Sequence, residues 1–252
     1  MKQFFDSVQG VILAGGKGTR MNQGNPSPIP KALYPLGGKP IVGYILVTLK
    51  NIGIKKPILV IGYKADLIKK EMGDSFNYVI QKKRLGTGHA AKLGVLAVKN
   101  SYHDVLILQG DDSAFYKGET LKKFIVNHQK QKAILSFLTT EVSDPKEMGR
   151  IIRDKNNKVL AIIEKENLTP AFKKIKEINC GAYLINLVWA KNNMAKIKKT
   201  LKGGKEYPLP DIVKIALEEG QKTIAYKIPA REWHGINSPS ELVEGEKIIS
   251  SR

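Results

Sequence analysis

The sequence has little of what marks secreted or membrane-spanning proteins. Cys180 is the only cysteine, so no disulfide can form within the chain, which suits a reducing cytoplasm. No apolar run approaches the roughly 18 residues that a membrane-spanning helix needs. The first residues, Met1 to Asp6, lack the long apolar stretch and the cleavage site of a signal peptide. We therefore expect a cytoplasmic protein without a membrane partner.

Acidic residues are also scarce compared with basic ones. The 252 residues include 42 Lys and Arg but only 23 Asp and Glu, so the formal net charge is +19. Such a charge suits either a nucleic-acid binder or an enzyme that acts on polyanions. The lysines occur in scattered pairs, such as Lys55-Lys56 and Lys122-Lys123, and not in one stripe interleaved with aromatic residues. This distribution favours small polyanionic substrates, and no nucleic-acid partner is expected.

Strand-like and helix-like segments alternate in the first half of the chain. Strands are predicted at 10–13, 57–61, 78–81, 105–109 and 133–139, and helices at 41–52, 66–72, 88–99 and 119–130. Strands that alternate with helices form βαβ units. The pattern predicts an α/β fold with a Rossmann-like, mostly parallel sheet flanked by helices, and with ligands at the carboxyl ends of the strands.

The second half of the chain predicts a smaller, mixed arrangement. Two strand-like segments flank a turn-rich stretch and predict a hairpin. Further elements are expected in this order: the hairpin strands at 150–153 and 158–164, a strand at 178–185, helices at 187–201 and 211–219, and a strand at 223–228. Ser238-Pro239 then opens a last helix, with serine as its N-cap. Since no long linker or internal repeat is present, we expect a single domain over 1–252, with its two halves meeting near residue 140.

The most informative motif is LAGGKGTRM, over residues 13–21, directly after the first predicted strand. Its glycines let the backbone turn tightly and direct successive N–H groups at an anion, while Lys17 and Arg20 add positive charge. The Walker pattern is excluded because Gly18 follows Lys17, and the dinucleotide pattern because Met21 stands where a third glycine is needed. The motif predicts a cradle for a triphosphate.

A second motif, PKALYPLGGKP, follows over residues 30–40. Its prolines stiffen the segment and would hold Lys31 against the phosphates. Together the two motifs resemble the signature of the sugar nucleotidyltransferase superfamily, and within it the uridylyltransferase domains of bacterial N-acetylglucosamine-1-phosphate uridylyltransferases. The resemblance continues in order, over nearly the whole chain, through QKKRLGTGHAA, LQGDD, MGRIIRD, IIEKEN, EINCGAYLIN and GIN.

The resemblance implies transfer of UMP from UTP to a sugar-1-phosphate, with a UDP-sugar and pyrophosphate as products. The half up to about residue 140 would bind the nucleotide, and the half from about 141 the sugar, N-acetylglucosamine-1-phosphate by resemblance. The amide of Gln81 can both donate to and accept from the edge of uracil. The resemblance assigns the contacts with uracil to Gln81 and Gly86. It assigns the other contacts with the nucleotide to Thr87, Leu13, Ala14, Gly15 and Gly16.

Asp111 ends a buried-looking strand, where an α/β sheet presents ligands. A carboxylate there suits Mg²⁺, and the resemblance pairs Asp111 with Asn237 as metal ligands. An oxygen of the sugar phosphate would attack the α-phosphorus of UTP, and the protein would align and neutralise the two polyanions. Arg20 and Lys17 would hold the leaving pyrophosphate, and Lys31 would steady the phosphates.

The resemblance places Gly149, Glu164 and Asn179 at the sugar. The pattern departs from close relatives at Pro208 and Pro210, which stand where those relatives have Tyr and Thr and which remove side-chain hydroxyls and backbone donors. The preference for an N-acetyl sugar is therefore left open.

Three other features carry weaker expectations. Asp112 is a second metal contact or a solvated side chain, and the solvated state is favoured. His89 and Cys180 are interpreted as structural. The segment 22–29 is longer than in close relatives, so a lid over the triphosphate can differ there.

Three alternatives stay open. Asp112 and the two prolines favour glucose-1-phosphate as the sugar, with uridylyl or thymidylyl transfer. A regulatory protein that binds nucleotide sugars without catalysis is a second alternative, and a nucleic-acid module is the third. No hexapeptide repeats are present, so the acetyltransferase domain of full-length family members, and trimerisation through it, are not expected. A homo-oligomer is compatible with the sequence.

Overall fold

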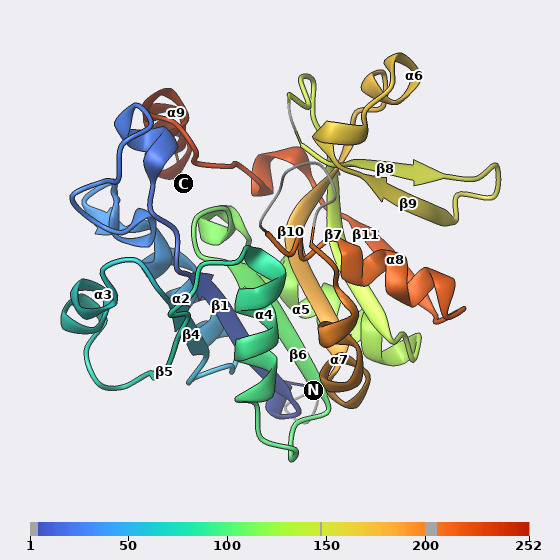
Figure 1. The fold of residues 1–252 in the computed structure, drawn as a ribbon, viewed down its shortest axis with the longest axis horizontal. Coiled ribbons are helices and arrows are strands. Elements are labelled where there is room, and N and C mark those ends of the chain that lie inside the picture. The colour runs from blue at the N-terminus through green and yellow to red at the C-terminus, as the bar shows by residue number, and fades with distance from the viewer. Residues whose placement is uncertain (1–4, 147, 200–205, 252) are drawn as a thin grey trace.

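The computed structural model describes residues 5–146, 148–199 and 206–251, and one large sheet forms their centre (Figure 1). Its main path runs through β11 (Thr223–Lys227), β7 (Leu135–Glu141), β10 (Glu177–Asn186), β6 (Asp104–Gln109), β1 (Val8–Ala14), β4 (Ile58–Ile61) and β5 (Asn77–Ile80). Neighbours from β6 to β5 pair in parallel, as does β11 with β7, whereas β10 is antiparallel to both of its neighbours. The predicted α/β fold with a mostly parallel sheet is therefore confirmed.

Helices cover both faces of this sheet (Figure 1). One face carries α4 (Thr87–Leu96), α7 (Leu187–Asn193) and α8 (Asp211–Glu218), and the other carries α2 (Ile41–Asn51), α3 (Ala65–Met72) and α5 (Gly118–Lys130). Successive residues of a strand point to opposite faces. Val11 of β1 accordingly shares a buried cluster with Val95 of α4, and Ile12 shares the other with Ile45 of α2. Burial on both faces explains why the strands are continuous apolar runs.

The predicted hairpin is present as β8 (Arg150–Arg153) and β9 (Val159–Ile163), which pair antiparallel. Asp154 shapes its turn, because its Oδ1 accepts from the backbone N–H groups of Asn156 and Lys158, each at 2.9 Å. The hairpin extends away from the main path of the sheet and joins it through β10 (Figure 1). A short helix, α6 (Pro170–Lys173), follows, and a small separate sheet pairs β2 (Pro35–Leu36) with β3 (Lys39–Pro40).

The helix predicted over 187–201 is too long. Its α-helical part, α7, ends at Asn193, and a 3₁₀ turn over Met194–Lys196 follows. At Asn193 φ widens to −113°, and the side chain donates to Trp189 O. The predicted end at 200–201 lies outside the described residues. The last helix, α9 (Pro239–Ser250), is confirmed, with Ser238 Oγ accepting from the N–H of Glu241.

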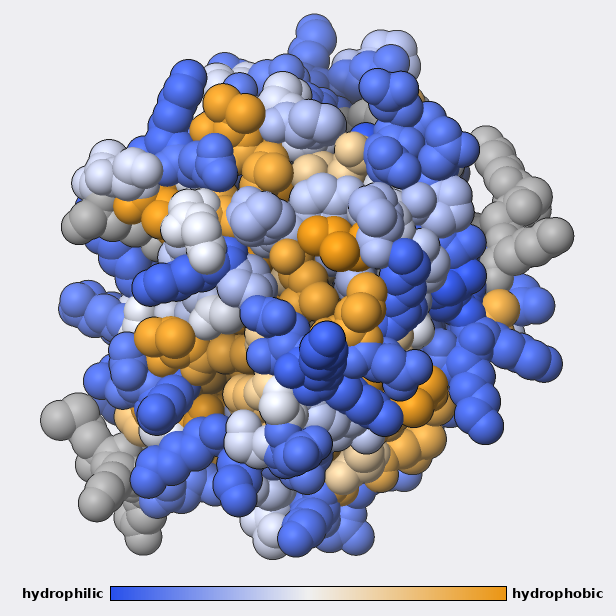
Figure 2. All heavy atoms as spheres, turned by 90° about the vertical axis from the view of Figure 1, so that its left-hand side faces the viewer, coloured by the Kyte–Doolittle hydropathy of each residue, from blue (hydrophilic) through white to orange (hydrophobic). Residues whose placement is uncertain are grey.

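The surface mixes hydrophilic and apolar side chains. Figure 2 shows the face on the left of Figure 1, where apolar groups lie between hydrophilic ones. Within the described part of the chain, no helix is long and apolar enough to cross a membrane.

Candidate active site

A cleft of about 560 Å³ opens at the carboxyl ends of β1 and β6. Parallel strands present their carboxyl ends at one edge of the sheet, which is where this fold class binds ligands. The cleft is lined by every residue predicted to contact nucleotide or metal or to act in catalysis: Leu13, Ala14, Gly15, Gly16, Lys17, Arg20, Lys31, Gln81, Gly86, Thr87, Asp111 and Asn237. The fold thus brings together residues that are far apart in the sequence.

The glycine-rich loop is held by its carbonyl groups. Gly16 O accepts from the N–H of Lys31, and Lys17 O accepts from the N–H of Ser27, each at 3.3 Å. These two bonds join the loop to Lys31 and Ser27, and the loop residues line the cleft. Gly18 adopts φ +66°, a conformation that favours glycine. The local geometry therefore agrees with the motif.

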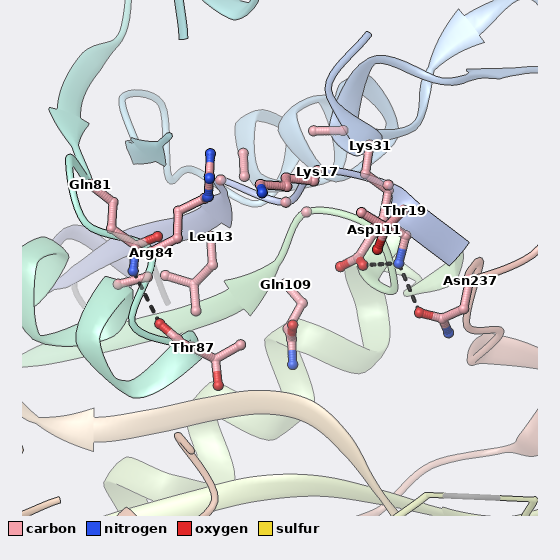
Figure 3. Close-up of a pocket in the computed structure, with 18 of the residues that line it drawn as sticks. Leu13, Lys17, Thr19, Lys31, Gln81, Arg84, Thr87, Gln109, Asp111 and Asn237 are labelled. Carbon is pink, nitrogen blue, oxygen red and sulfur yellow. Dashed lines mark hydrogen bonds and ion pairs between the residues drawn. The ribbon is translucent and has the colours of Figure 1, made fainter. Parts of the chain in front are cut away.

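Two cations donate to the amide oxygen of Asn237, and Figure 3 shows one of them, Lys31, between Asn237 and Asp111. Asn237 Oδ1 accepts from Lys31 Nζ at 2.8 Å and from Arg20 Nη2 at 2.7 Å. Lys31 Nζ also forms an ion pair with Asp111 Oδ2. Lys31 belongs to a 3₁₀ turn over Lys31–Leu33 and is 8% exposed, so the surrounding chain fixes its position.

The oxygens of this cluster suit a divalent cation. Asp111 follows β6, Asn237 precedes α9, and both direct oxygen atoms at Lys31 Nζ, so the two oxygens converge on one positive centre. Mg²⁺ takes oxygen ligands and is commonly bound by one or two carboxylates together with substrate phosphates. Among the described residues there is no cluster of three or more His, Cys, Asp or Glu that could hold a metal. The donor set therefore fits a metal shared with substrate phosphates.

At the end of the cleft opposite Asn237, the contacts centre on Gln81 (Figure 3). Its Nε2 donates to Gly86 O at 3.1 Å and lies 3.0 Å from His89 Nδ1. Because an amide nitrogen can only donate, His89 Nδ1 must be the acceptor, which requires a neutral ring with its proton on Nε2. Burial, then the charge of Lys92, lowers the pKa of His89, so the neutral ring is favoured. His89 therefore has a place in the site, holding Gln81, that its sequence context did not indicate.

Gly86 and Thr87 connect this end of the cleft to the segment that carries the two unusual prolines. Gly86 adopts φ +93°, and a Cβ there would lie 2.8 Å from Tyr207 O. Thr87 Oγ1 accepts from the N–H of Leu209 at 3.1 Å, so this hydroxyl supports the neighbouring segment as well as lining the cleft. Pro208 and Pro210 thus flank a backbone donor that the fold uses.

Asp112 is not a solvated side chain, so that expectation is wrong. Its Oδ1 is buried and has no hydrogen-bond partner among the described residues. Burial, then the charge of Asp111, raises the pKa of Asp112 to about 7. The reason is local: the chain turns after β6 into a 3₁₀ turn over Ser113–Phe115, which leaves Asp112 half-buried with its Oδ1 near Gly235. A metal contact by Asp112 stays a prediction.

The three residues predicted at the sugar lie together, outside the lining of the cleft described above. A Cβ on Gly149 would lie 2.7 Å from Glu164 Oε1, and Gly149 O accepts from the N–H of Asn179 at 3.1 Å. The amide of Asn179 is held by Tyr183, whose hydroxyl accepts from Asn179 Nδ2 at 2.6 Å. Burial, then the charge of Glu166, raises the pKa of Glu164 to about 7. Their contact with a sugar stays a prediction.

The cleft is also lined by residues that the sequence did not single out, among them Gln109, Arg84 and Glu206. Gln109 is the last residue of β6, Arg84 lies on the segment between β5 and α4, and Glu206 precedes α8. Position could have revealed Gln109, since it directly precedes Gly110-Asp111 at a strand end. Arg84 sits in a run of basic residues, and nothing in the sequence separates it from its solvated neighbours. Cys180, by contrast, is buried and structural as expected.

Fold and site together define an α/β class of protein in which a glycine-rich loop lies beside a carboxylate at the carboxyl ends of parallel strands. Residues 9–252 match the family described as nucleotidyl transferase, and the chain belongs to that family. The resemblance to sugar nucleotidyltransferases that the motifs predicted is thus confirmed.

Individual relatives agree with this assignment. The chain is 32% identical over 244 residues to the bifunctional protein GlmU of Desulfotalea psychrophila, covering 96% of this chain and 70% of that protein. It is 37% identical over 243 residues to the bifunctional protein GlmU of Clostridium novyi, covering 96% of this chain and 52% of the relative. The chain thus spans about half the length of most of the curated relatives it matches.

A solved structure shares the fold. It is a protein assigned as a glucose-1-phosphate thymidylyltransferase from Bacillus anthracis, crystallised with sucrose, with a TM-score of 0.77 and 24% identity. The alignment covers 96% of this chain and 94% of that one, and at this identity it shows the fold alone.

Proposed function

We propose that the protein transfers UMP from UTP to a sugar-1-phosphate, N-acetylglucosamine-1-phosphate in particular, and releases pyrophosphate. The observation that carries the proposal is the convergence of Lys31 and Arg20 on Asn237 beside Asp111, at the open end of the glycine-rich loop. Two polyanions and a divalent cation require such a mixture of cations and oxygen ligands. The motifs shared with N-acetylglucosamine-1-phosphate uridylyltransferases support the choice of substrates.

The chemistry needs alignment more than a catalytic base. The sugar phosphate is already anionic, so its oxygen can attack the α-phosphorus of UTP without losing a proton to the protein. The bond from the α-phosphorus to the bridging oxygen breaks, and pyrophosphate leaves with the electron pair. Lys17, Arg20 and Lys31 would neutralise the negative charge that gathers on the phosphates, in a site whose cations are already positioned.

A divalent cation would be held by Asp111 and Asn237, and Mg²⁺ is the ion that their oxygens suit best. When bound, it supplies further positive charge at the phosphates. Arg20 and Lys31 both donate to the Asn237 Oδ1 that would become a metal ligand, so these cations orient the amide before a metal binds. Gln81 would contact the base of the nucleotide. Its Nε2 donates a hydrogen bond to Gly86 O, and its Oε1 lies next to Gly15.

The test is pyrophosphate release with Mg²⁺ across the four NTPs and dTTP against several sugar-1-phosphates, with EDTA controls. We expect the highest rate with UTP and N-acetylglucosamine-1-phosphate. The highest rate with dTTP or glucose-1-phosphate would keep the reaction class and reject the substrates proposed here. Equal signals with and without EDTA for every pair would reject the proposed activity and favour a binding protein.

A further inference from the structure

A guanidinium at the mouth of the cleft belongs to none of the residues assigned above. Arg84 is exposed and lines the same cleft as Lys17. Figure 3 shows its side chain extending from the side of Gln81 toward the loop that carries Lys17. Among the described residues, the ion pairs found involve other cations. A cation that faces an anion-binding cleft and lacks a carboxylate partner in this part of the chain is suited to an anionic ligand.

The ring of Tyr63 supports this arginine. The guanidinium carbon of Arg84 lies 5.8 Å from the centroid of the Tyr63 ring, within the range of a cation–π contact. A second cation, Lys64, lies 5.6 Å from the same centroid, but its Nζ donates to Pro28 O at 2.5 Å. Of the two, only Arg84 lines the cleft.

Tyr63 is itself fixed to the phosphate-binding loop. Its backbone N–H donates to Gly15 O at 3.3 Å, and its hydroxyl donates to Ser27 O at 2.7 Å. Ser27 is fully buried, and its Oγ lies 2.5 Å from the hydroxyl of Tyr34. Hydrogen bonds thus hold the segment 22–29, where a lid was expected, beside the glycine-rich loop. Tyr63 connects this segment to the segment that carries Arg84.

We propose that Arg84 is a further nucleotide-binding residue that contacts the triphosphate, and that Tyr63 is the positioning residue that holds it there. The fork of a guanidinium matches phosphate oxygens, and its place near the loop of Lys17 favours phosphate over uracil. The inference rests on the proposed function only in taking the cleft to bind a nucleoside triphosphate.

The experiment is calorimetric titration of the full chain with UTP, UMP and uridine in the presence of Mg²⁺. Arg84→Gln is compared with Lys83→Gln, which removes the same charge from the same segment at an exposed position that does not line the cleft. We expect Arg84→Gln to weaken UTP binding by about tenfold, because a charge-assisted hydrogen bond is lost, and to leave uridine within about twofold. Lys83→Gln should change neither by more than about twofold. The proposal is overturned if the two variants behave alike, or if Arg84→Gln weakens uridine as much as UTP.

Two variants of Tyr63 separate its ring from its hydroxyl. Tyr63→Phe keeps the ring and loses the bond to Ser27 O, whereas Tyr63→Leu removes the ring. We expect Tyr63→Leu to weaken UTP binding more than Tyr63→Phe does, at similar thermal stability. We also expect the loss of UTP affinity in Arg84→Gln to become smaller in high salt, because salt screens the charge of the arginine. Equal losses in the two variants would reject the positioning role.

These titrations do not depend on turnover. A protein that releases no pyrophosphate, but whose UTP affinity depends on Arg84, would overturn the proposed activity and support this inference. A parent chain that turns over the substrates, but whose UTP affinity does not depend on Arg84, would do the opposite.

Discussion

At the scale of single residues, the site is organised by shared acceptors. Asn237 Oδ1 takes hydrogen bonds from Arg20 and Lys31, and Lys31 divides its donors between Asn237 and Asp111. One guanidinium and one ammonium group thus face a neutral oxygen and a single carboxylate, which leaves one positive charge of this cluster uncompensated. That surplus is what a pair of phosphorylated substrates would neutralise.

Replacing Asp111 with Asn tests the centre of this cluster. The substitution keeps the size of the side chain and removes its charge, so we expect turnover to fall by about a hundredfold or more, with the melting temperature close to that of the parent. Pyrophosphate release and thermal unfolding measure the two effects. Asp66→Asn, at an exposed position on α3, is the matched control. Turnover of Asp111→Asn at the parent rate with Mg²⁺ would reject the metal assignment.

His89 can be tested through the hydrogen bond it accepts. His89→Leu removes the acceptor for Gln81, so we expect the KM for UTP to rise several-fold, whereas His89→Asn can place an oxygen where Nδ1 lies. Since burial and Lys92 lower the pKa of His89, the parent should keep a constant KM from pH 8 down to about 6.5, the usual pKa of histidine, and lose affinity only at lower pH. Similar KM values for His89→Leu and the parent would show that His89 does not position Gln81.

At the scale of elements, α4 is pressed closely onto the sheet. Gly94 of α4 has no room for a Cβ, which would lie 2.4 Å from Val11 Cγ1 and 2.9 Å from Val60 Cγ2. Gly43 of α2 has nothing within 4 Å of that position. The close approach matters for the site, because α4 begins at Thr87, in the cleft.

These two helical glycines should respond to alanine in opposite directions. Gly94→Ala overpacks the contact with β1 and β4, and we expect a loss of about 1–3 kcal/mol in the free energy of unfolding. Gly43→Ala removes the backbone entropy cost of glycine without a clash, and we expect a gain of about 0.5–1 kcal/mol. Urea unfolding of both variants measures the difference. A stabilised Gly94→Ala variant would contradict the close packing of α4.

At the scale of the whole molecule, buried carboxyl groups make stability depend on pH in two directions. Burial alone would raise the pKa of Asp104, but the nearby His128 and a hydrogen bond from Gln129 lower it. Such a group stabilises the fold at neutral pH, and this stabilisation is lost as pH falls through its folded pKa. Glu164 acts in the opposite sense, because its pKa rises from 4.5 to about 7.

Glu164→Gln should therefore stabilise the protein only at higher pH. Between pH 4.5 and 7 the folded state binds the proton of Glu164 more tightly than the unfolded state does, so stability falls as pH rises through this window. We expect the variant to exceed the parent by about 1–3 kcal/mol at pH 8 and to match it more closely at pH 5. Denaturant unfolding at both pH values measures this, with Glu244→Gln, an exposed position, as control. A difference that does not change with pH would contradict the raised pKa.

Much of the architecture follows from local patterns. The strands β1, β4 and β6 and the helices between them are recognisable because burial on both faces demands apolar runs and helix packing demands a 3.6-residue period. Turn chemistry likewise determines the glycine-rich loop and the start of α9 at Ser238, since each depends on a few neighbouring residues. The site residues on these motifs all reached the cleft, because strand ends meet at one edge of a parallel sheet.

The rest depends on contacts between distant parts of the chain. The insertion of β10 between β6 and β7, in the opposite direction, involves pairings that no local period encodes. The same holds for the hydrogen bonds of Lys31 and Arg20 to Asn237, for the buried Oδ1 of Asp112 near Gly235, and for the contact of Arg84 with the Tyr63 ring. The sequence by itself determined the elements and the glycine-rich motif, because local backbone and burial preferences set them. Only the tertiary structure decided which side chains share an acceptor, lose water or face the cleft, because those outcomes depend on packing between segments far apart in the chain.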